Sequence, residues 1–306
     1  MKLSYFYFQL CRKMLRGKKT VGHTVFGNKI LDTESGGKLI EKYLNQESPC
    51  MIARIGSVEM QAINAVTNVE LGLWKAIPES HLKTLGNNAG FFPATEEMAK
   101  RFADVYRKAC ADIDVAALLL NRDEDYFFRK YSKKLKYITL TALEPYYSNF
   151  PWSTALEGKR VLIVHPFAKT VLSQYSKRRE LFSDSCVLPE FELITFKAVQ
   201  TIGSNTGGFS TWFDALEYMK DEIAKLEFDV AILGCGAYAF PLASHIKRMG
   251  KKALIMGGAT QLLFGIKGRR WDDNPVISSL YNEAWVRPNE EDRPEGFENV
   301  EGGCYW

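Results

Sequence analysis

The feature that most constrains the fold of this chain is an alternation of short apolar runs with longer segments of helical periodicity. Most of the short runs are apolar at successive positions, which is typical of strands that helices cover on both faces. This order predicts an α/β fold with a doubly wound, mostly parallel, Rossmann-like sheet of about six or seven strands. We expect strands at 50–55, 115–120, 136–141, 160–165, 192–199, 229–234 and 252–256, and helices at 36–46, 57–66, 95–111, 168–182, 211–226 and 237–249.

Length and composition are those of a globular protein with one large domain or two small ones. The chain has 306 residues, of which 46% are hydrophobic and 25% are charged. We expect the Rossmann-like domain at 36–306. If this domain has two lobes, they meet near 143–159, where prolines and aromatic residues indicate a loop. The tail ends in "EGGCYW", whose large aromatic residues indicate a docked end.

Residues 1–35 form a separate basic and aromatic segment. "MKLSYFYFQLCRKMLRGKK" combines aromatic side chains with lysines and arginines. This mixture favours a helix that lies on an anionic membrane surface. The alternative is a helix packed on the domain with a solvated basic flank.

Several classes of protein do not fit the sequence. The net charge of +4 is too small to indicate a nucleic-acid partner. No apolar run approaches the roughly 20 residues of a membrane span. The six cysteines form no C-x-x-C pair, and without a recognisable signal peptide we expect reduced thiols in the cytoplasm. The four histidines lack the spacing of a catalytic zinc site. The α/β-hydrolase and P-loop motifs are absent.

Polar and small residues gather where the expected strands end, and ligands of open α/β sheets bind at the carboxyl ends of strands. The first strand runs into Arg54, Gly56, Ser57 and Glu59. An arginine and a glutamate at such a turn either meet a ligand together or form a structural ion pair. His165 ends another strand, where it either bonds a phosphate or moves a proton, or is a buried structural histidine.

"GCGAYA" places Gly234, Gly236 and Tyr238 after a strand and matches the loose G-x-G-x-x-A dinucleotide pattern. The following strand ends in glycine instead of an acid that could hold a ribose, so we do not expect NAD. A nucleotide diphosphate fits without that acid. The alternative is that the glycines only permit tight packing of the strand and the helix.

"GGATQLLFGIKGRRW" joins a glycine turn to a basic cluster. Cations beside such a turn suit a diphosphate, and a tryptophan suits stacking on a base or sugar. The alternative is a solvated basic loop. The acidic "NRDEDYF", with Asp123, Glu124 and Asp125, is either a cation site or a solvated loop or helix start. In "GGATQLLFGIKGRRW", the candidate ligand-binding residues are Gly257, Gly258, Gln261, Lys267, Arg269, Arg270 and Trp271.

From about residue 36 to its C-terminus, the chain resembles the GT-D-fold glycosyltransferases and related proteins of bacterial surface-polysaccharide loci. The family marker is Arg-hydrophobic-Gly-Asp-Gly-Glu, and Arg54, Gly56 and Glu59 match it, whereas Ser57 replaces the aspartate. The motifs that carry the resemblance are "RIGSVE", "NNAGFFP", "PWS", "VLIVHPFA", "LPEFEL", "GCGAYAFPLA", "GGATQLLFGIKGRRW" and "EGGCYW".

The resemblance implies a nucleotide-sugar site and leaves metal use open. A pair of carboxylates holds a divalent ion on a diphosphate better than one does, so Mn²⁺ or Mg²⁺ at Glu59 is a candidate cofactor only. Lys267, Arg269 and Arg270 are cations that could offset the diphosphate charge instead.

We therefore expect a cytoplasmic glycosyltransferase that moves a sugar from a nucleotide-sugar, a UDP-sugar first, to a glycan or lipid-linked acceptor. Membrane association through the N-terminal segment is part of this expectation. The alternatives are a non-catalytic nucleotide- or sugar-binding protein on the same fold and an NAD-linked oxidoreductase. Glu59 is the first candidate base, followed by Glu190 and Glu144. The candidate substrate-binding residues are Arg54, Gly56, Ser57, Asn88, His165, Gly234, Gly236, Tyr238, Gly257, Gly258, Gln261, Lys267, Arg269, Arg270 and Trp271.

Overall fold

The structure, a computed structural model, describes residues 2–15, 22–24, 27–132, 134–201 and 205–306. Its strands form one sheet in the order β1-β4-β3-β2-β8-β7-β5-β6, and all of the paired strands are parallel. The predicted α/β, Rossmann-like fold is confirmed. The strands are β1 (Ile30–Leu31), β2 (Cys50–Ala53), β3 (Val115–Leu118), β4 (Lys136–Thr139), β5 (Arg160–His165), β6 (Glu192–Lys197), β7 (Val230–Leu233) and β8 (Lys252–Ile255).

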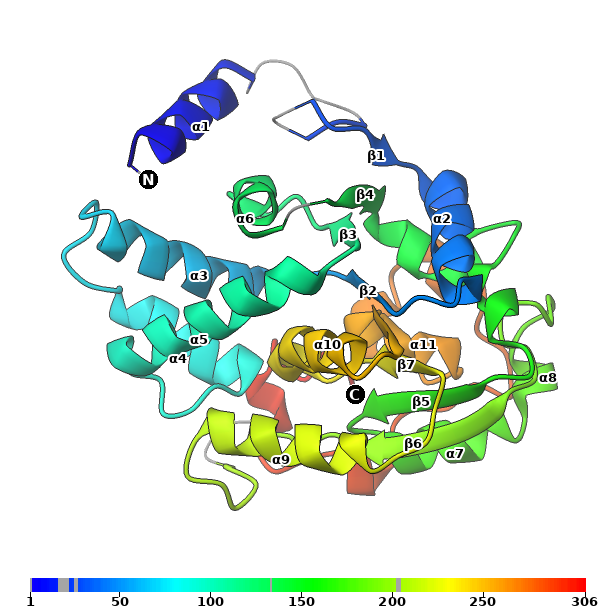
Figure 1. Cartoon of the computed structure of the whole chain (residues 1–306). Coiled ribbons are helices and arrows are strands. Elements are labelled where there is room, and N and C mark those ends of the chain that lie inside the picture. Colours follow the sequence, from blue (N-terminus) through cyan, green and yellow to red (C-terminus); the bar gives the residue numbers. More distant parts are fainter. Residues whose placement is uncertain (1, 16–21, 25–26, 133, 202–204) are drawn as a thin grey trace.

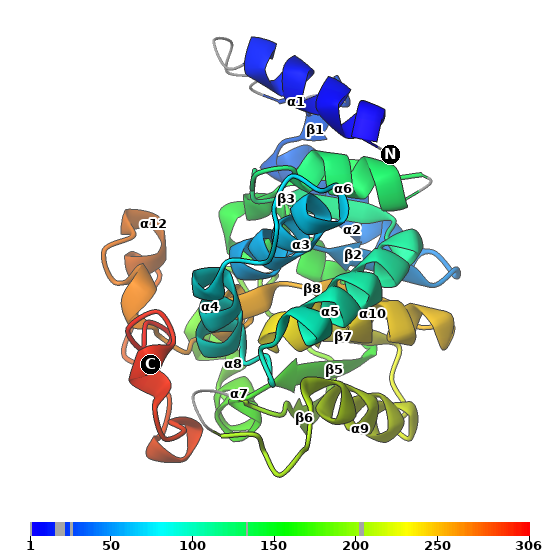
Figure 2. The same cartoon turned by 90° about the vertical axis from the view of Figure 1, so that its left-hand side faces the viewer.

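The seven expected strands are all present, and β1 is an eighth that the sequence did not indicate, because two residues are too few for an apolar run. Helices cover both faces of the sheet (Figures 1 and 2). The helices are α1 (Lys2–Leu15), α2 (Thr33–Asn45), α3 (Ser57–Glu70), α4 (Glu79–Ala89), α5 (Glu96–Ala109), α6 (Glu124–Tyr131), α7 (Ala168–Tyr175), α8 (Arg178–Leu181), α9 (Trp212–Ala224), α10 (Ala239–Arg248), α11 (Thr260–Leu263) and α12 (Pro275–Ser278).

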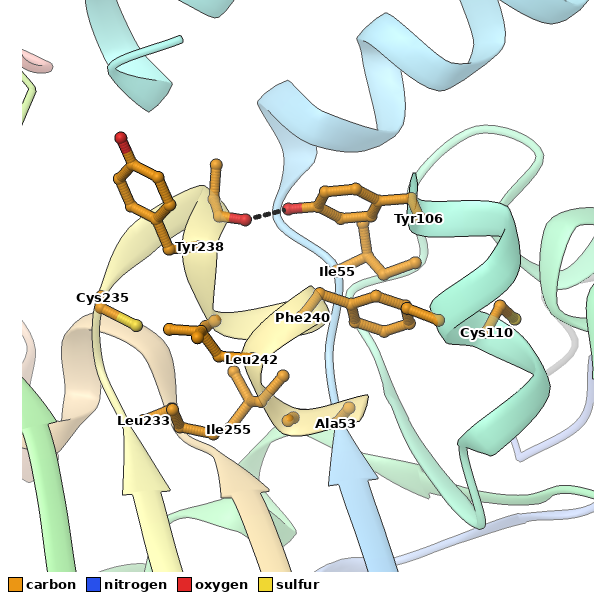
Figure 3. Packing of buried hydrophobic residues seen from close by; sticks show 14 of the residues in the cluster. Ala53, Ile55, Tyr106, Cys110, Leu233, Cys235, Tyr238, Phe240, Leu242 and Ile255 are labelled. Carbon is orange, nitrogen blue, oxygen red and sulfur yellow. Dashed lines mark hydrogen bonds between the residues drawn. The ribbon is translucent and has the colours of Figure 1, made fainter. Parts of the chain in front are cut away.

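Alternate residues of each strand face alternate layers of the core. Met51 and Ala53 of β2 pack into the cluster beneath α3, α5 and α10, whereas Ile52 packs into the opposite cluster beneath α2 and α11. In the first cluster, Tyr106 of α5 stacks on Phe240 of α10, with ring centroids 5.2 Å apart (Figure 3). The Tyr106 hydroxyl donates a hydrogen bond of 2.7 Å to the Ala237 carbonyl oxygen.

The strand order reverses between β2 and β8. The first half of the chain builds β1 to β4 on one side of this point, and the second half builds β5 to β8 on the other. Segment 143–159, expected near a junction, runs from β4 to β5 and thus connects the two halves of the sheet. Its Trp152 is fully buried and donates a hydrogen bond to the Leu143 carbonyl oxygen. In open parallel sheets, such a switch point opens a crevice at the carboxyl ends of the strands.

Helix α1 packs on the domain through one face and leaves the other exposed. Tyr5 and Phe8 are buried against Tyr126 of α6. In both views the helix lies at one end of the molecule (Figures 1 and 2). Residues 16–21, which include the basic residues that end the N-terminal motif, lie outside the described residues. Among the described residues, no helix is both long enough and apolar enough to cross a bilayer.

The C-terminal tail is docked, as its aromatic residues indicated. Trp306 is 5% exposed, and its indole nitrogen donates a hydrogen bond of 2.6 Å to the Asp292 carbonyl oxygen. Its ring also packs against that of Phe167, which follows β5, with ring centroids 5.8 Å apart. The tail therefore reaches the carboxyl edge of the sheet. The five cysteines whose side chains the structure describes are all free thiols.

Candidate functional site

The carboxyl ends of β2, β3, β5, β7 and β8 surround a cleft of about 260 Å³ at the switch point between β2 and β8. The end of α4, the segment after β6 and the C-terminal tail form further walls, together with residues of α5 and α10. Thirteen of the residues that the sequence pointed to line this cleft together. They are Arg54, Gly56, Ser57, Glu59, Asn88, His165, Gly234, Gly236, Tyr238, Gly257, Gly258, Gln261 and Arg270.

Arg54 crosses from the end of β2 to the end of β8. Gly257 has a φ of +67°, and a Cβ atom there would lie 3.2 Å from Nη1 of Arg54 and 3.3 Å from its Cζ. The positive φ favours glycine at 257, and a Cβ atom there would also press on the guanidinium, which would have to shift by a few tenths of an ångström. Among the described residues, Arg54 has neither a hydrogen bond nor an ion pair. An unpaired guanidinium in a cleft indicates an anionic ligand.

Glu59 lies in the first turn of α3, whose N-cap is Gly56. Its carboxylate folds back over Gly56 so closely that a Cβ atom at 56 would overlap Oε2. Burial raises the pKa of Glu59, and the charge of Arg54 partly opposes this rise. The two side chains do not form the structural ion pair that was the alternative interpretation, since neither has an ion-pair partner among the described residues.

Arg54 is the shared positive charge for three acids, of which two are buried and Glu144 is half-buried. Besides Glu59 these are Glu124, at the start of α6, and Glu144, beyond the end of β4. Burial raises the pKa of all three, and Arg54 lowers each in part. The pKa of Glu124 rises to about 7. Glu144 accepts a hydrogen bond of 2.7 Å from the Tyr146 hydroxyl and does not line the cleft, so its predicted role as base has no geometric support.

The acidic motif "NRDEDYF" forms a loop and the start of α6. Glu124 accepts hydrogen bonds from the amides of Leu119 (3.3 Å) and Asn121 (2.9 Å), and it thereby ties the loop after β3 to the helix. Asp123 accepts hydrogen bonds from Tyr5 and Gln9 of α1. The helix-start interpretation is therefore the correct one.

His165 lines the cleft as a neutral hydrogen-bonding group. It is 3% exposed, and burial lowers its pKa to about 3. Its Nδ1 accepts a hydrogen bond of 3.0 Å from the Phe167 amide. A neutral imidazole whose Nδ1 accepts must carry its proton on Nε2, so the ring presents a donor without a charge. Gly234 is required beneath this ring, because a Cβ atom there would lie 2.6 Å from Cδ2 of His165.

The C-terminal tail supplies cleft residues that sequence reasoning missed: Glu301, Tyr305 and Trp306, together with Val300. Arg270 Nη1 donates to the Tyr305 hydroxyl at 2.5 Å and lies 3.3 Å from Glu301 Oε2. The Tyr305 ring packs on Gly258, where a Cβ atom would overlap it. The docked "EGGCYW" motif was the available signal, but nothing local to it revealed which strands it would meet.

Residues of the "NNAGFFP" motif form the wall of the cleft at the end of α4. Asn88 lines the cleft at the end of α4, which is terminated by Gly90 in the left-handed conformation. The Thr201 hydroxyl donates a hydrogen bond of 2.6 Å to the Gly90 carbonyl oxygen and lies 2.9 Å from the Tyr238 hydroxyl. Tyr238 in turn stacks on Trp212, with centroids 4.8 Å apart. This network fixes the cleft wall.

Besides Glu144, four predicted site residues lie outside the cleft. Glu190 lies just before β6, at the amino edge of the sheet, where it pairs with Arg178. Such a position is across the sheet from the cleft, so a role as base there is not supported. Lys267 packs over the Tyr281 ring, 5.1 Å from its centroid.

Arg269 donates hydrogen bonds to the carbonyl oxygens of Gly302 and Gly303, and it therefore fastens the tail instead of facing a ligand. Trp271 packs edge-on against Tyr305, with ring centroids 5.9 Å apart. The short helix at Arg269–Trp271 turns each successive side chain in a new direction, which leaves Arg270 alone of this cluster in the cleft.

The carboxylates of the cleft do not amount to a metal site built by the protein. Within the described ranges, no group of three or more His, Cys, Asp or Glu side chains is placed to hold a metal ion. The cleft has Glu59 and Glu301, while the hydroxyl of Ser57 donates a hydrogen bond of 2.8 Å to Asn121. A divalent ion bound here would take most of its ligands from water or from a diphosphate.

Comparison with known proteins adds little to this geometry. No family model matches the chain, and no curated protein matches it. A solved structure described as "Selenomethionine substituted structure of domain of unknown function 1792 (DUF1792)" is similar to it, with 13% sequence identity and a TM-score of 0.46. That similarity covers 86% of this chain and 92% of the other.

Proposed function

We propose that this protein is a glycosyltransferase that moves a sugar from a nucleotide-sugar, with a UDP-sugar as first candidate, to a glycan or lipid-linked acceptor in surface-polysaccharide synthesis. One observation carries the proposal: the unpaired Arg54 and the buried Glu59 share a glycine-lined cleft at the switch point of the sheet. The match of "RIGSVE" to the GT-D marker supports the same activity.

The cleft suits a nucleotide diphosphate. Arg54 and Arg270 line it, and guanidinium groups bind diphosphate oxygens through paired N–H donors. Gly236 has a φ of +57°, and a Cβ atom there would meet nothing within 4 Å, so the backbone of this turn faces open space. Backbone amides in such glycine turns can approach a phosphate closely. His165 adds a neutral donor.

We assign Glu59 the role of general base for the acceptor hydroxyl. The acceptor oxygen bonds to the anomeric carbon as the bond from that carbon to the diphosphate oxygen breaks. The electron pair leaves with the diphosphate, and the acceptor proton passes to Glu59. A carboxylate whose pKa is raised by burial is a stronger base than an exposed one. Arg54 stabilises the charge that develops on the leaving group.

We also propose that α1 docks on an anionic bilayer. Its outward side chains are exposed, and they belong to Leu3 (87%), Phe6 (53%), Tyr7 (64%) and Leu10 (56%). Basic residues accompany them in the sequence. On sedimentation, phosphatidylglycerol vesicles should carry the protein into the pellet. The double variant Phe6→Ser/Leu10→Ser should stay in the supernatant. Equal binding to pure phosphatidylcholine vesicles would contradict the charge dependence.

The central experiment measures donor binding and turnover separately. Thermal shift across nucleoside diphosphates identifies the preferred nucleobase of the donor. Repeating the measurement with Mn²⁺ and with EDTA tests whether binding depends on a metal ion. Release of nucleoside diphosphate from matched nucleotide-sugars then measures turnover. Glu59→Gln should lower turnover by about 10²–10⁴-fold, the range that a general base contributes, and leave donor affinity within a few-fold.

Glu190→Gln is the matched control, because it removes a carboxylate at the opposite edge of the sheet and should leave turnover unchanged. Saturable diphosphate binding with no turnover of any nucleotide-sugar would instead identify a binding protein. The absence of diphosphate binding would refute the proposal.

A further inference from the structure

A second cleft, of about 280 Å³, adjoins the cleft at the switch point of the sheet, which we call the donor cleft. The two clefts meet at Ser57, which lines both. Apart from Ser57 and Met60, the second cleft is lined by polar and aromatic residues, with a single arginine as the permanent charge. Besides Ser57, its lining residues are Met60, Gln61, Asn64, Asn68, Trp74, His81, Asn121 and Arg122.

One serine and three amide side chains of this cleft form a strip along α3. Ser57, Gln61, Asn64 and Asn68 follow the i, i+4, i+7, i+11 spacing of one helix face, whereas Glu59 faces the donor cleft. At about 1.5 Å per residue, the strip is roughly 16 Å long. It therefore suits an extended ligand that reaches the donor cleft with one end.

Trp74 gives this cleft an aromatic face. It is 37% exposed, and its ring lies edge-on to His81 with centroids 5.6 Å apart. Sugar rings present apolar C–H faces bordered by hydroxyl groups. An exposed indole in a cleft that is also lined by amide donors and acceptors matches both parts of that surface.

The ridge between the two clefts is a strained loop. Leu119 lines the donor cleft and Asn121 lines the second cleft. Between them Leu120 has a φ of +60° and is 77% exposed. A positive φ is unfavourable for leucine, and such strain is held where the surrounding structure imposes it. Here the two hydrogen bonds to Glu124 do so, and they hold the ridge in place.

We propose that the second cleft binds the acceptor glycan, with the accepting sugar passing Ser57 into the donor cleft. This inference rests on the proposed glycosyltransferase activity. Amides and an indole, with Arg122 as the one permanent charge in the lining, select a neutral or acetamido glycan. The far end of the strip, Asn68, lies 3.4 Å from the Tyr5 hydroxyl of α1, so an acceptor held at a bilayer by α1 would enter from that end.

Fluorine NMR of the protein labelled with 5-fluorotryptophan tests both clefts at once. The chain has six tryptophans, and Trp74→Phe and Trp306→Phe assign the two signals that matter. UDP should shift the Trp306 signal, since Trp306 lines the donor cleft, and leave that of Trp74 in place. Cellobiose or N,N′-diacetylchitobiose should shift the Trp74 signal and leave that of the buried Trp152 unchanged.

The outcomes separate the two proposals. If UDP, GDP and the other nucleoside diphosphates all leave Trp306 unmoved, the proposed function fails. If a diphosphate shifts Trp306 and neither disaccharide shifts Trp74, the acceptor inference alone is overturned.

Kinetics provides the second measurement. Trp74→Ala and Gln61→Ala should each raise the acceptor KM at least tenfold and leave hydrolysis of the donor by water unchanged. Tyr218→Ala, which removes an exposed aromatic ring on α9 outside both clefts, is the control. An unchanged acceptor KM in the Trp74 variant would overturn the inference.

Discussion

Arg54 lies against the backbone of Gly257, so that a Cβ atom at 257 would be 3.2 Å from its Nη1. This contact joins β2 to β8, the two neighbouring strands that come from different halves of the chain. It sets the position of an unpaired cation in the cleft.

Gly257→Ala should impair donor binding more than it impairs folding. The added methyl group pushes against the guanidinium, so the Kd for the nucleoside diphosphate should rise tenfold or more. The positive φ alone costs roughly 1–2 kcal/mol of stability. Gly158→Ala is the control, because Gly158 has a similar φ of +69° with nothing within 4 Å of its Cβ position. Calorimetric titration of both variants should show weakened binding only at 257, and equal losses would contradict the contact.

Arg54→Gln should move the acid limb of the pH–rate profile to higher pH. Arg54 lowers the pKa of Glu59, which burial raises. Glu59 must be ionised to accept a proton, so turnover falls as pH drops through its pKa. Removing the cation raises that pKa, and the fall then begins at a higher pH. The measurement is kcat at saturating donor from pH 5 to 9, and an unshifted limb would exclude Glu59 as the titrating group.

Glu124→Gln should flatten the dependence of stability on pH. The pKa of Glu124 is about 7 in the fold, above its ordinary value of 4.5. Between these values the folded state holds a proton that the unfolded chain has lost, so stability falls as pH rises from about 4.5 to 7. The shift corresponds to about 2–3 kcal/mol across that window. Urea unfolding at pH 5 and pH 7.5 should show a smaller difference for the variant than for the parent protein.

His165 should stay neutral far below the usual pKa of histidine. Because burial lowers its pKa to about 3, its imidazole should keep the Nε2–H tautomer from pH 8 to pH 5. Nitrogen-15 NMR of labelled histidine distinguishes the protonated nitrogen from the bare one, and His165→Gln assigns the signal. A free histidine-containing peptide serves as the titrating control. Protonation of His165 above pH 5 would show that its environment is wetter than described.

The sequence by itself determined the strands, because their signal is local. Most of the seven expected strands are short runs whose residues are apolar at successive positions, and all seven are present in the sheet. It also determined that Arg54 and Glu59 belong to one turn. Helices α4 and α6 gave weak signals: α4 buries only Leu85, and α6 begins in an acidic run that also suits a loop.

Only the tertiary structure decided which of the polar residues meet. Arg269 and Arg270 are neighbours in the chain, yet one fastens the tail and the other lines the cleft. Glu190 and Glu59 both lie beside strands, but at opposite edges of the sheet. Periodicity reports which face a residue takes within its own element. The cleft depends on the crossover that places β8 beside β2 and on the docking of Trp306, and such long-range contacts leave no local trace in the sequence.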